Sequence, residues 1–236
     1  TMWPNNCRCA VGFSFDFDAE SLWLGTFRQE HPVILSRGEY GARVGIGRIL
    51  NLLNKYDIKA TFFVPGLTAE MHPDKVEAIH AAGHEIGHHG YRHENTHHMD
   101  LENEQAILDK GIECLKKITG QVTKGYRTPA GLPGPNTFRL LVDLDFIYDS
   151  SMMAQDEPYL YTVEGRGRQL LEIPFHWELD VFPHFAFNPR PYYSGLSAPS
   201  KVYEIWADEF DVCYQEGGYF GLTMHPQIMG KRHRMK

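Results

Sequence analysis

Two pairs of residues in this chain have the type and spacing of a metal site. Asp16 and Asp18 end a run of alternating apolar residues, and His89 and His93 follow a second apolar stretch. Two imidazoles four residues apart on a helical turn lie on one face and can bind one metal ion. With Asp18 as third ligand, the set predicts a catalytic divalent cation, Zn²⁺ in preference to Co²⁺ or another ion, with one position open to water. The alternative is a chance pairing, because the chain has 13 histidines.

Other polar residues have the type and placement of an acid and base apparatus. Asp16 lies on the same side of its strand as Asp18 by the two-residue period, so Asp16 is the candidate general base. Arg127 could hold that carboxylate in a bidentate ion pair. His225 is kept extended by the proline that follows it and is the candidate general acid, with Asp180 orienting its other ring nitrogen. The ordinary alternatives are solvated turn acids, a surface arginine and a buried structural histidine.

The segments that must position these residues alternate between apolar runs and helical patterns. The strand candidates are 9–17, 59–64, 83–87, 122–126, 146–148, 170–175 and 219–224, and helical spacing covers 44–56, 68–82, 100–119 and 202–214. This alternation predicts parallel βα units, arranged as an open doubly wound sheet or as a barrel. We expect the candidate residues at the carboxyl ends of the strands and long loops over 21–37 and 183–199, which could act as lids.

The overall composition narrows the class of partner. The 236 residues are 42% hydrophobic and carry a net charge of −7, so the chain is typical of a globular protein and not of a general nucleic-acid or anionic-membrane binder. A small molecule or a carbohydrate is the expected partner. No apolar run is long enough to cross a bilayer and the start has no export signal pattern. Four cysteines without a CxxC pair are expected to be reduced thiols, which predicts a cytoplasmic protein.

The polar stretches, taken in order along the chain, resemble the polysaccharide deacetylase superfamily, the nodulation-type (NodB-homology) domain of carbohydrate esterase family four. Five motifs carry the resemblance: Phe15-Asp-Phe-Asp18, His89-Gly-Tyr-Arg-His93, Arg127-Thr-Pro-Ala-Gly131, Leu179-Asp180 and Leu222-Thr-Met-His225-Pro226. The resemblance implies a distorted seven-stranded (β/α) barrel and one catalytic domain over residues 1–236. It also implies that Asp18, His89 and His93 hold the metal, that Asp16 is the base oriented by Arg127, and that His225 is the acid.

Details of the first two motifs are most similar to a branch of cytoplasmic peptidoglycan-deacetylase-like and allantoinase-like proteins. That branch commonly forms homo-oligomers, so we expect one here by analogy. The chain departs from the pattern in three ways. It has Asp-Phe-Asp where extracellular members have adjacent aspartates, it has Ala130 where many members have a larger side chain, and it stops soon after the fifth motif, so the domain looks short at its C-terminus.

The expected activity is metal-dependent hydrolysis of a C–N amide bond, most simply removal of an N-acetyl group from a sugar or a peptidoglycan-type substrate. The backbone N–H of Ala130 is a candidate donor to the oxyanion. One alternative is hydrolysis of a small cyclic amide or ureide, as in an allantoinase or an imidase. Another is a barrel that binds carbohydrate without catalysis.

Overall fold

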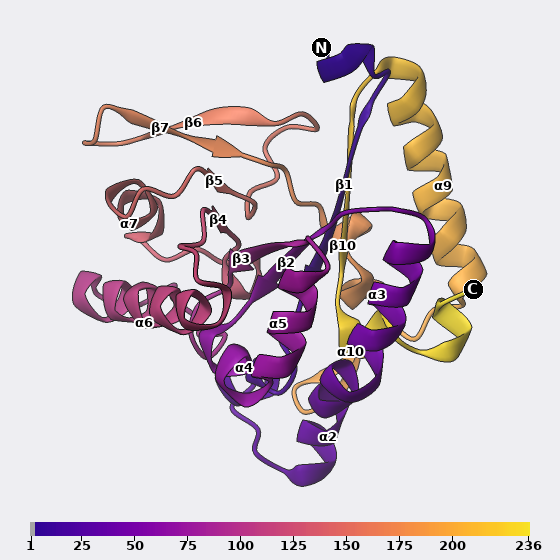
Figure 1. Cartoon of the computed structure of the whole chain (residues 1–236), viewed down its shortest axis with the longest axis horizontal. Coiled ribbons are helices and arrows are strands. Elements are labelled where there is room, and N and C mark those ends of the chain that lie inside the picture. The colour runs from indigo at the N-terminus through magenta and orange to yellow at the C-terminus, as the bar shows by residue number, and fades with distance from the viewer. Residues whose placement is uncertain (1–2) are drawn as a thin grey trace.

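The computed structural model describes residues 3–236 and contains a curled sheet of mixed direction, a distorted half-barrel covered by helices (Figure 1). Its strands, in spatial order, are β10 (Tyr219–Met224), β1 (Ala10–Asp16), β2 (Thr61–Val64), β3 (Glu85–His88), β4 (Gly125–Tyr126), β5 (Tyr148–Asp149), β7 (Arg168–Glu172) and β6 (Tyr159–Val163). The strands from β10 to β7 run parallel, and they are the predicted ones with shifted ends. The expected strand count of seven is too low, because β6 pairs antiparallel with β7 and makes the sheet eight-stranded.

The gap between the first and last parallel strands is bridged near the end of the sheet. Instead of a ladder between β7 and β10, the chain that follows β7 forms an isolated parallel bridge, Asp180 with Thr223 of β10. In Figure 1, β1 and β10 lie side by side along the helix α9 (Pro199–Glu216), far from β6. The bridge therefore brings the last parallel segment back to the first at the carboxyl end of the sheet.

The helices begin and end where local sequence dictates. α6 (Leu101–Thr119) starts at Asp100, whose Oδ1 accepts a hydrogen bond from the backbone N–H of Asn103, and it stops at the left-handed Gly120. The predicted helix 68–82 is two helices, α4 (Gly66–Met71) and α5 (Pro73–Ala81), because a proline lacks the N–H that would continue the first. The other helices are α1 (Ser21–Gly25), α2 (Pro32–Tyr40), α3 (Ile46–Lys55), α7 (Thr137–Asp143), α8 (Val181–Phe185) and α10 (Pro226–Met229).

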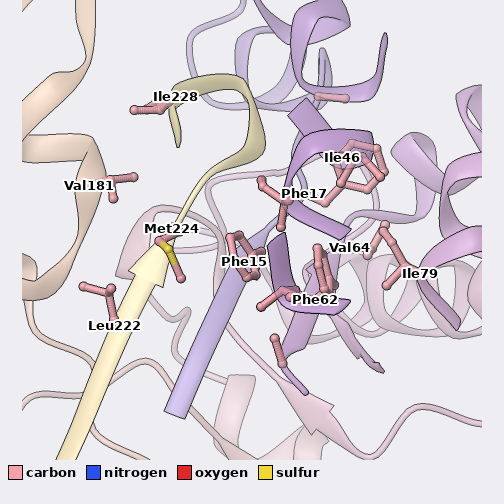
Figure 2. Packing of buried hydrophobic residues seen from close by; sticks show 14 of the residues in the cluster. Phe15, Phe17, Ile46, Phe62, Val64, Ile79, Val181, Leu222, Met224 and Ile228 are labelled. Atoms are coloured by element: carbon pink, nitrogen blue, oxygen red, sulfur yellow. The ribbon is translucent and has the colours of Figure 1, made fainter. Parts of the chain in front are cut away.

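Alternation along β1 separates the core from the site. Phe15 and Phe17 point to the side of the sheet that the helices cover. There they belong to a buried cluster with residues of β2 and of those helices, and the rings of Phe15 and Phe62 stack at 4.9 Å (Figure 2). Asp16 and Asp18 point to the opposite side, toward the imidazole of His225. Burial of the apolar face fixes the register, since a slip of one residue would place carboxylates in the core.

Both segments expected as long loops contain regular structure. The range 21–37 includes α1 and the start of α2, and the range 183–199 includes the end of α8 and a hairpin of β8 (Phe187–Pro189) with β9 (Tyr192–Ser194). These short elements are too brief for periodicity to reveal them. Among the described residues, no helix combines the length and apolar character needed to cross a bilayer.

Candidate active site

The candidate residues gather at the carboxyl ends of the parallel strands. A cavity of about 490 Å³ opens there, and polar residues from several strand ends line it: Asp16, His89, His93, Arg127, Asp180 and His225. Asp18 lies just behind them and is fully buried. Residues separated by up to about 200 positions in sequence thus meet in one place, as expected for a parallel α/β sheet.

Asp18, His89 and His93 form a group with the donor set of a divalent cation site. One potential ligand atom from each lies within 4.8 Å of the other two. Asp18 Oδ1 is 3.5 Å from His89 Nε2 and 3.7 Å from His93 Nε2. Asp18 Oδ1 and His89 Nε2 are buried without a hydrogen-bond partner among the described residues, although buried polar atoms are normally paired. A cation between these atoms would supply the missing partner, so the residues fit a metal.

Hydrogen bonds at the Nδ1 atoms of His89 and His93 leave both Nε2 atoms able to bind a cation. His89 Nδ1 is 2.7 Å from the carbonyl oxygen of Arg127, which can only accept, so Nδ1 carries the proton. The Thr26 hydroxyl donates to the backbone oxygen of His93 and accepts from His93 Nδ1 at 2.6 Å. Each ring therefore presents the lone pair of its Nε2 to Asp18, which is the arrangement that a hydrogen bond at the other ring nitrogen commonly imposes on metal-binding histidines.

The backbone between these histidines is not a helical turn, so that part of the sequence argument is wrong. Residues 89–93 form a loop in which Gly90 (φ 71°) and His93 (φ 60°) are both left-handed. The preceding His88 fixes this loop: its Nδ1 accepts from the N–H of Gly90 and its Nε2–H donates to the carbonyl of Leu108, each at 3.1 Å. Glycine allows the left-handed turn that a helix would not contain.

Asp16 has partners within the protein. Arg127 Nη1 donates to Asp16 Oδ1 at 2.8 Å, and the guanidinium is held in turn by Ser14 and by both polar groups of Ser150. The predicted ion pair is present, through one nitrogen rather than two. Burial tends to raise the pKa of Asp16, but the charges of Arg127 and of nearby His89 outweigh it and hold the pKa below its usual value. The carboxylate is therefore ionised at neutral pH.

Asp18 behaves in the opposite way. Its Oδ2 accepts a hydrogen bond from Gln227 at 3.1 Å, and it has no cationic side chain comparable to Arg127. Burial, together with the neighbouring Asp16 charge, raises the pKa of Asp18 well above its ordinary value. A buried carboxylate with a raised pKa is stabilised in its ionised form by a cation, which agrees with the orphaned Oδ1.

His225 and Asp180 form the second polar pair at the cavity. His225 Nδ1 lies 3.4 Å from Asp180 Oδ1, and its Nε2 lies 3.9 Å from Asp16 Oδ2. Asp180 Oδ1 also accepts from the N–H of Phe182, which fixes the carboxyl. Burial lowers the pKa of His225 to about 4 and raises the pKa of Asp180 to about 8, so near neutrality the proton of this pair resides on the carboxyl. With Nδ1 directed at that acid, the imidazole's own proton is placed on Nε2, which faces Asp16.

The remaining wall of the cavity is apolar. Leu22, Phe27, Phe175, Trp177 and Phe182 line it, and the rings of Phe27 and Phe182 stack at 6.5 Å. Both segments expected as lids contribute, the first through α1 and the second through α8 and the hairpin. Ala130 also lines the cavity, and its left-handed backbone (φ 58°) is unusual for a residue with a side chain. Such strain is commonly kept where it positions a functional group.

Sequence reasoning missed three polar residues that touch this cluster: Gln227, His88 and Thr26. Gln227 follows His225 by two positions, so its proximity to the strand end was a usable signal. His88 directly precedes His89 at the end of β3 and is fully buried. Nothing in its local sequence marks Thr26, because its contact with His93 depends on the position of α1.

Comparison with known proteins adds the family. The sequence model described as "Polysaccharide deacetylase" matches residues 37–148. A peptidoglycan deacetylase of Helicobacter pylori is 34% identical over 94% of this chain and 84% of its own length. The chain belongs to the polysaccharide deacetylase family.

Two solved structures show how far the likeness extends within and around this family. A protein of Mycobacterium smegmatis described as a polysaccharide deacetylase superposes with a TM-score of 0.92 at 40% identity, covering 99% of this chain and 82% of that one. An allantoinase superposes with a TM-score of 0.85 at 28% identity, with the same coverages. The deacetylase-type barrel inferred from the five motifs is thus confirmed as the fold. The expected likeness to a branch that includes allantoinase-like proteins is also confirmed.

Proposed function

We propose that this member of the polysaccharide deacetylase family is a metal-dependent hydrolase that removes an N-acetyl group from a sugar or a peptidoglycan-type substrate. The observation that carries the proposal is the orphaned pair Asp18 Oδ1 and His89 Nε2, beside a base and an acid that are already oriented. Asp18, His89 and His93 would hold the ion. A divalent cation there supplies Lewis-acid polarisation of an amide carbonyl and lowers the pKa of water. Zn²⁺ suits imidazole-rich ligation.

The side chains of this protein divide the proton transfers between them. Asp16 is ionised and held by Arg127 through Oδ1, so its Oδ2 is available to take a proton from the attacking water. His225 Nε2 carries a proton on the same side of the cavity and donates it to the departing amine, while Asp180, which holds the proton of the pair, passes that proton to Nδ1 so that the ring stays neutral. The N–H of Ala130 contributes to binding of the developing oxyanion. The apolar wall excludes water around the reacting amide.

The alternative substrate is a small cyclic amide or ureide, and the likeness to an allantoinase is the observation that supports it. We also propose a cytoplasmic location, because Cys7, Cys9, Cys114 and Cys213 form no disulfide. A homo-oligomer remains our expectation, supported by the exposed apolar side chains of Tyr203 and Val212 on α9.

The test measures metal content and product release together. The purified chain is stripped with chelator, reloaded with Zn²⁺ or Co²⁺, and assayed for acetate release from N-acetylglucosamine oligomers and for ring opening of allantoin. The Asp16→Asn variant is the matched control, because it should keep the metal and lose turnover. Chelator-sensitive acetate release supports the proposal, ring opening alone transfers the protein to cyclic-amide hydrolysis, and failure to bind either metal contradicts the site.

A further inference from the structure

Two acidic side chains are buried together behind Arg127. Asp149 ends β5 and Glu172 ends β7, and they are register partners in the parallel pairing of these strands, so their side chains lie on the same side of the sheet. Both residues have a relative exposure of 0%. Neither takes part in the chemistry described above.

Each acid has one oxygen that is bonded and one that is not. Asp149 Oδ1 accepts from the Ser151 hydroxyl at 2.8 Å, and Glu172 Oε1 accepts from the N–H groups of Ser151 and Met152 at 2.9 Å each. Asp149 Oδ2 and Glu172 Oε2 are buried with no partner among the described residues. Two neighbouring carboxylates with two orphaned acceptors are satisfied by a single proton, which lets one acid donate to the other.

Ser151, which is hydrogen-bonded to both acids, and the adjacent Ser150 also hold the base apparatus. The Ser150 carbonyl and hydroxyl accept from Arg127 at 2.9 and 2.8 Å, and Arg127 holds Asp16. The Ser151 hydroxyl accepts from the N–H of Thr128 at 2.9 Å, and Thr128 begins the turn that contains Ala130. Any displacement of these two serines would reach both the base and the candidate oxyanion donor.

We propose that Asp149 and Glu172 share one proton and act as positioning residues. They hold Ser150 and Ser151 in the places where these serines accept hydrogen bonds from Arg127 and Thr128. This inference rests on the proposed function for its catalytic consequence only, since the shared proton exists whether or not the substrate is identified. A fully ionised pair would instead leave two like charges in contact inside the protein, which is strongly unfavourable.

The electrostatic surroundings agree with this geometry. Burial and the neighbouring Glu172 raise the pKa of Asp149 well above its ordinary value, and burial raises the pKa of Glu172. The titratable groups that face the pair are Arg127, Tyr126 and Tyr159. Arg127 is already engaged by Asp16, the Tyr126 hydroxyl is hydrogen-bonded with that of Thr128, and the Tyr159 hydroxyl makes no hydrogen bond to either acid, so none of them replaces the proton.

The kinetic test compares an isosteric amide with a truncation. In Glu172→Gln the amide oxygen still accepts from Ser151 and Met152 while the amide nitrogen donates permanently to Asp149, so kcat should stay within about threefold of wild type. Glu172→Ala removes the acceptor for the N–H groups of Ser151 and Met152. It should lower kcat roughly tenfold to a hundredfold with unchanged zinc affinity. Asp149→Asn is a second isostere in case the truncation does not fold, and Glu164→Gln, at an exposed position after β6, is the matched control. Equal loss of kcat in the Gln and Ala variants would overturn the proposal.

A spectroscopic arm works without any substrate. In protein labelled with ¹³C at the glutamate carboxyl, the signal that disappears in Glu172→Gln should not titrate through the pH range in which exposed glutamates ionise. Normal titration of that signal would overturn the shared proton even if the enzyme is active. A non-titrating signal in a protein inactive on every substrate would instead contradict only the proposed function.

Discussion

The two sides of the cavity differ in how their charges are satisfied. On one side, Asp16 is paired with Arg127, which holds the base in place, and the neighbouring His225 Nδ1 lies 3.4 Å from Asp180 without a hydrogen bond among the described residues. On the other side, Asp18 Oδ1 and His89 Nε2 are buried 3.5 Å apart and have no hydrogen-bond partner among the described residues. The base therefore has its counter-charge within the chain, whereas the other side is complementary to a cation. The contrast implies that Asp16 relies on Arg127 for its charge balance and that Asp18 needs a bound cation for its own.

The largest expected effect comes from removing the acidic member of the cation side. Asp18→Asn should reduce zinc affinity below detection and lower kcat/KM by about 10³-fold or more, because the group that offsets the metal charge is lost. Without metal, however, the same variant should unfold at a temperature no lower than that of metal-free wild type, since a costly buried carboxylate is gone. Calorimetric titration and thermal unfolding, each with and without zinc, measure both. A large drop in metal-free stability would contradict the view that Asp18 is kept for the cation.

A smaller loss is expected when the candidate base is replaced. Asp16→Asn removes the base while the amide can still accept from Arg127, so kcat should fall by about 10²- to 10⁴-fold with zinc content unchanged. Metal analysis of the purified variant beside a turnover assay tests this. Turnover close to wild type would mean that another group takes the proton from water.

Gln227 connects the two sides, because it follows the candidate acid His225 by two positions and donates a hydrogen bond to Asp18, a candidate metal ligand. Gln227→Ala should weaken zinc binding by about tenfold to a hundredfold, because a metal ligand that loses its hydrogen-bond partner binds less tightly, and should leave kcat at saturating zinc nearly unchanged. A competition titration against a zinc-binding dye gives the affinity. Gln227→Glu keeps an oxygen but not the donor, so it should not restore binding.

The mildest effect concerns stability and pH at His88. Burial lowers the pKa of His88 to about 3, below its ordinary 6.5. The stabilisation that comes from keeping this ring neutral is complete above about pH 6.5 and is lost as pH falls toward 3. Between pH 6.5 and 5, wild type should therefore lose about 2 kcal/mol of unfolding free energy relative to His88→Asn. Urea unfolding of both proteins at the two pH values measures this difference, and parallel pH dependence would contradict the neutral ring.

Much of the site could be predicted because strand ends are strong signals. The alternation at residues 9–17 and the apolar stretch at 219–224 place Asp16, Asp18 and His225 at one edge of a parallel sheet, and the structure brings them together there. The spacing of His89 and His93 led to the right pair of residues through the wrong backbone, since the left-handed Gly90 bends the chain where a helix was expected. Convergence of ligands is thus easier to predict than the conformation that achieves it.

Other features of the fold and the site could not be predicted from the sequence, for physical reasons. β6 lies at the edge of the sheet with only Val163 buried, so its sequence lacks the apolar pattern of an interior strand. The pairing of Asp149 with Glu172 depends on the register of β5 and β7. Thr26 reaches His93 only when α1 packs beside the loop of residues 89–93. Contacts of this kind arise between elements and leave no trace in either one alone.

The close approach of α1 to the loop of residues 89–93 has a consequence for how this enzyme could diversify. A side chain at Gly25 would lie 1.8 Å from the carbonyl oxygen of Arg92, and the neighbouring Thr26 is hydrogen-bonded to His93. The part of the pocket wall carried by α1 is therefore joined to the candidate cation site, whereas Trp177, which lines the same pocket just before α8, is about half exposed at 48%. Evolution or an engineer can alter the Trp177 side at little risk to the cation, and any new preference for substrate is easiest to acquire there.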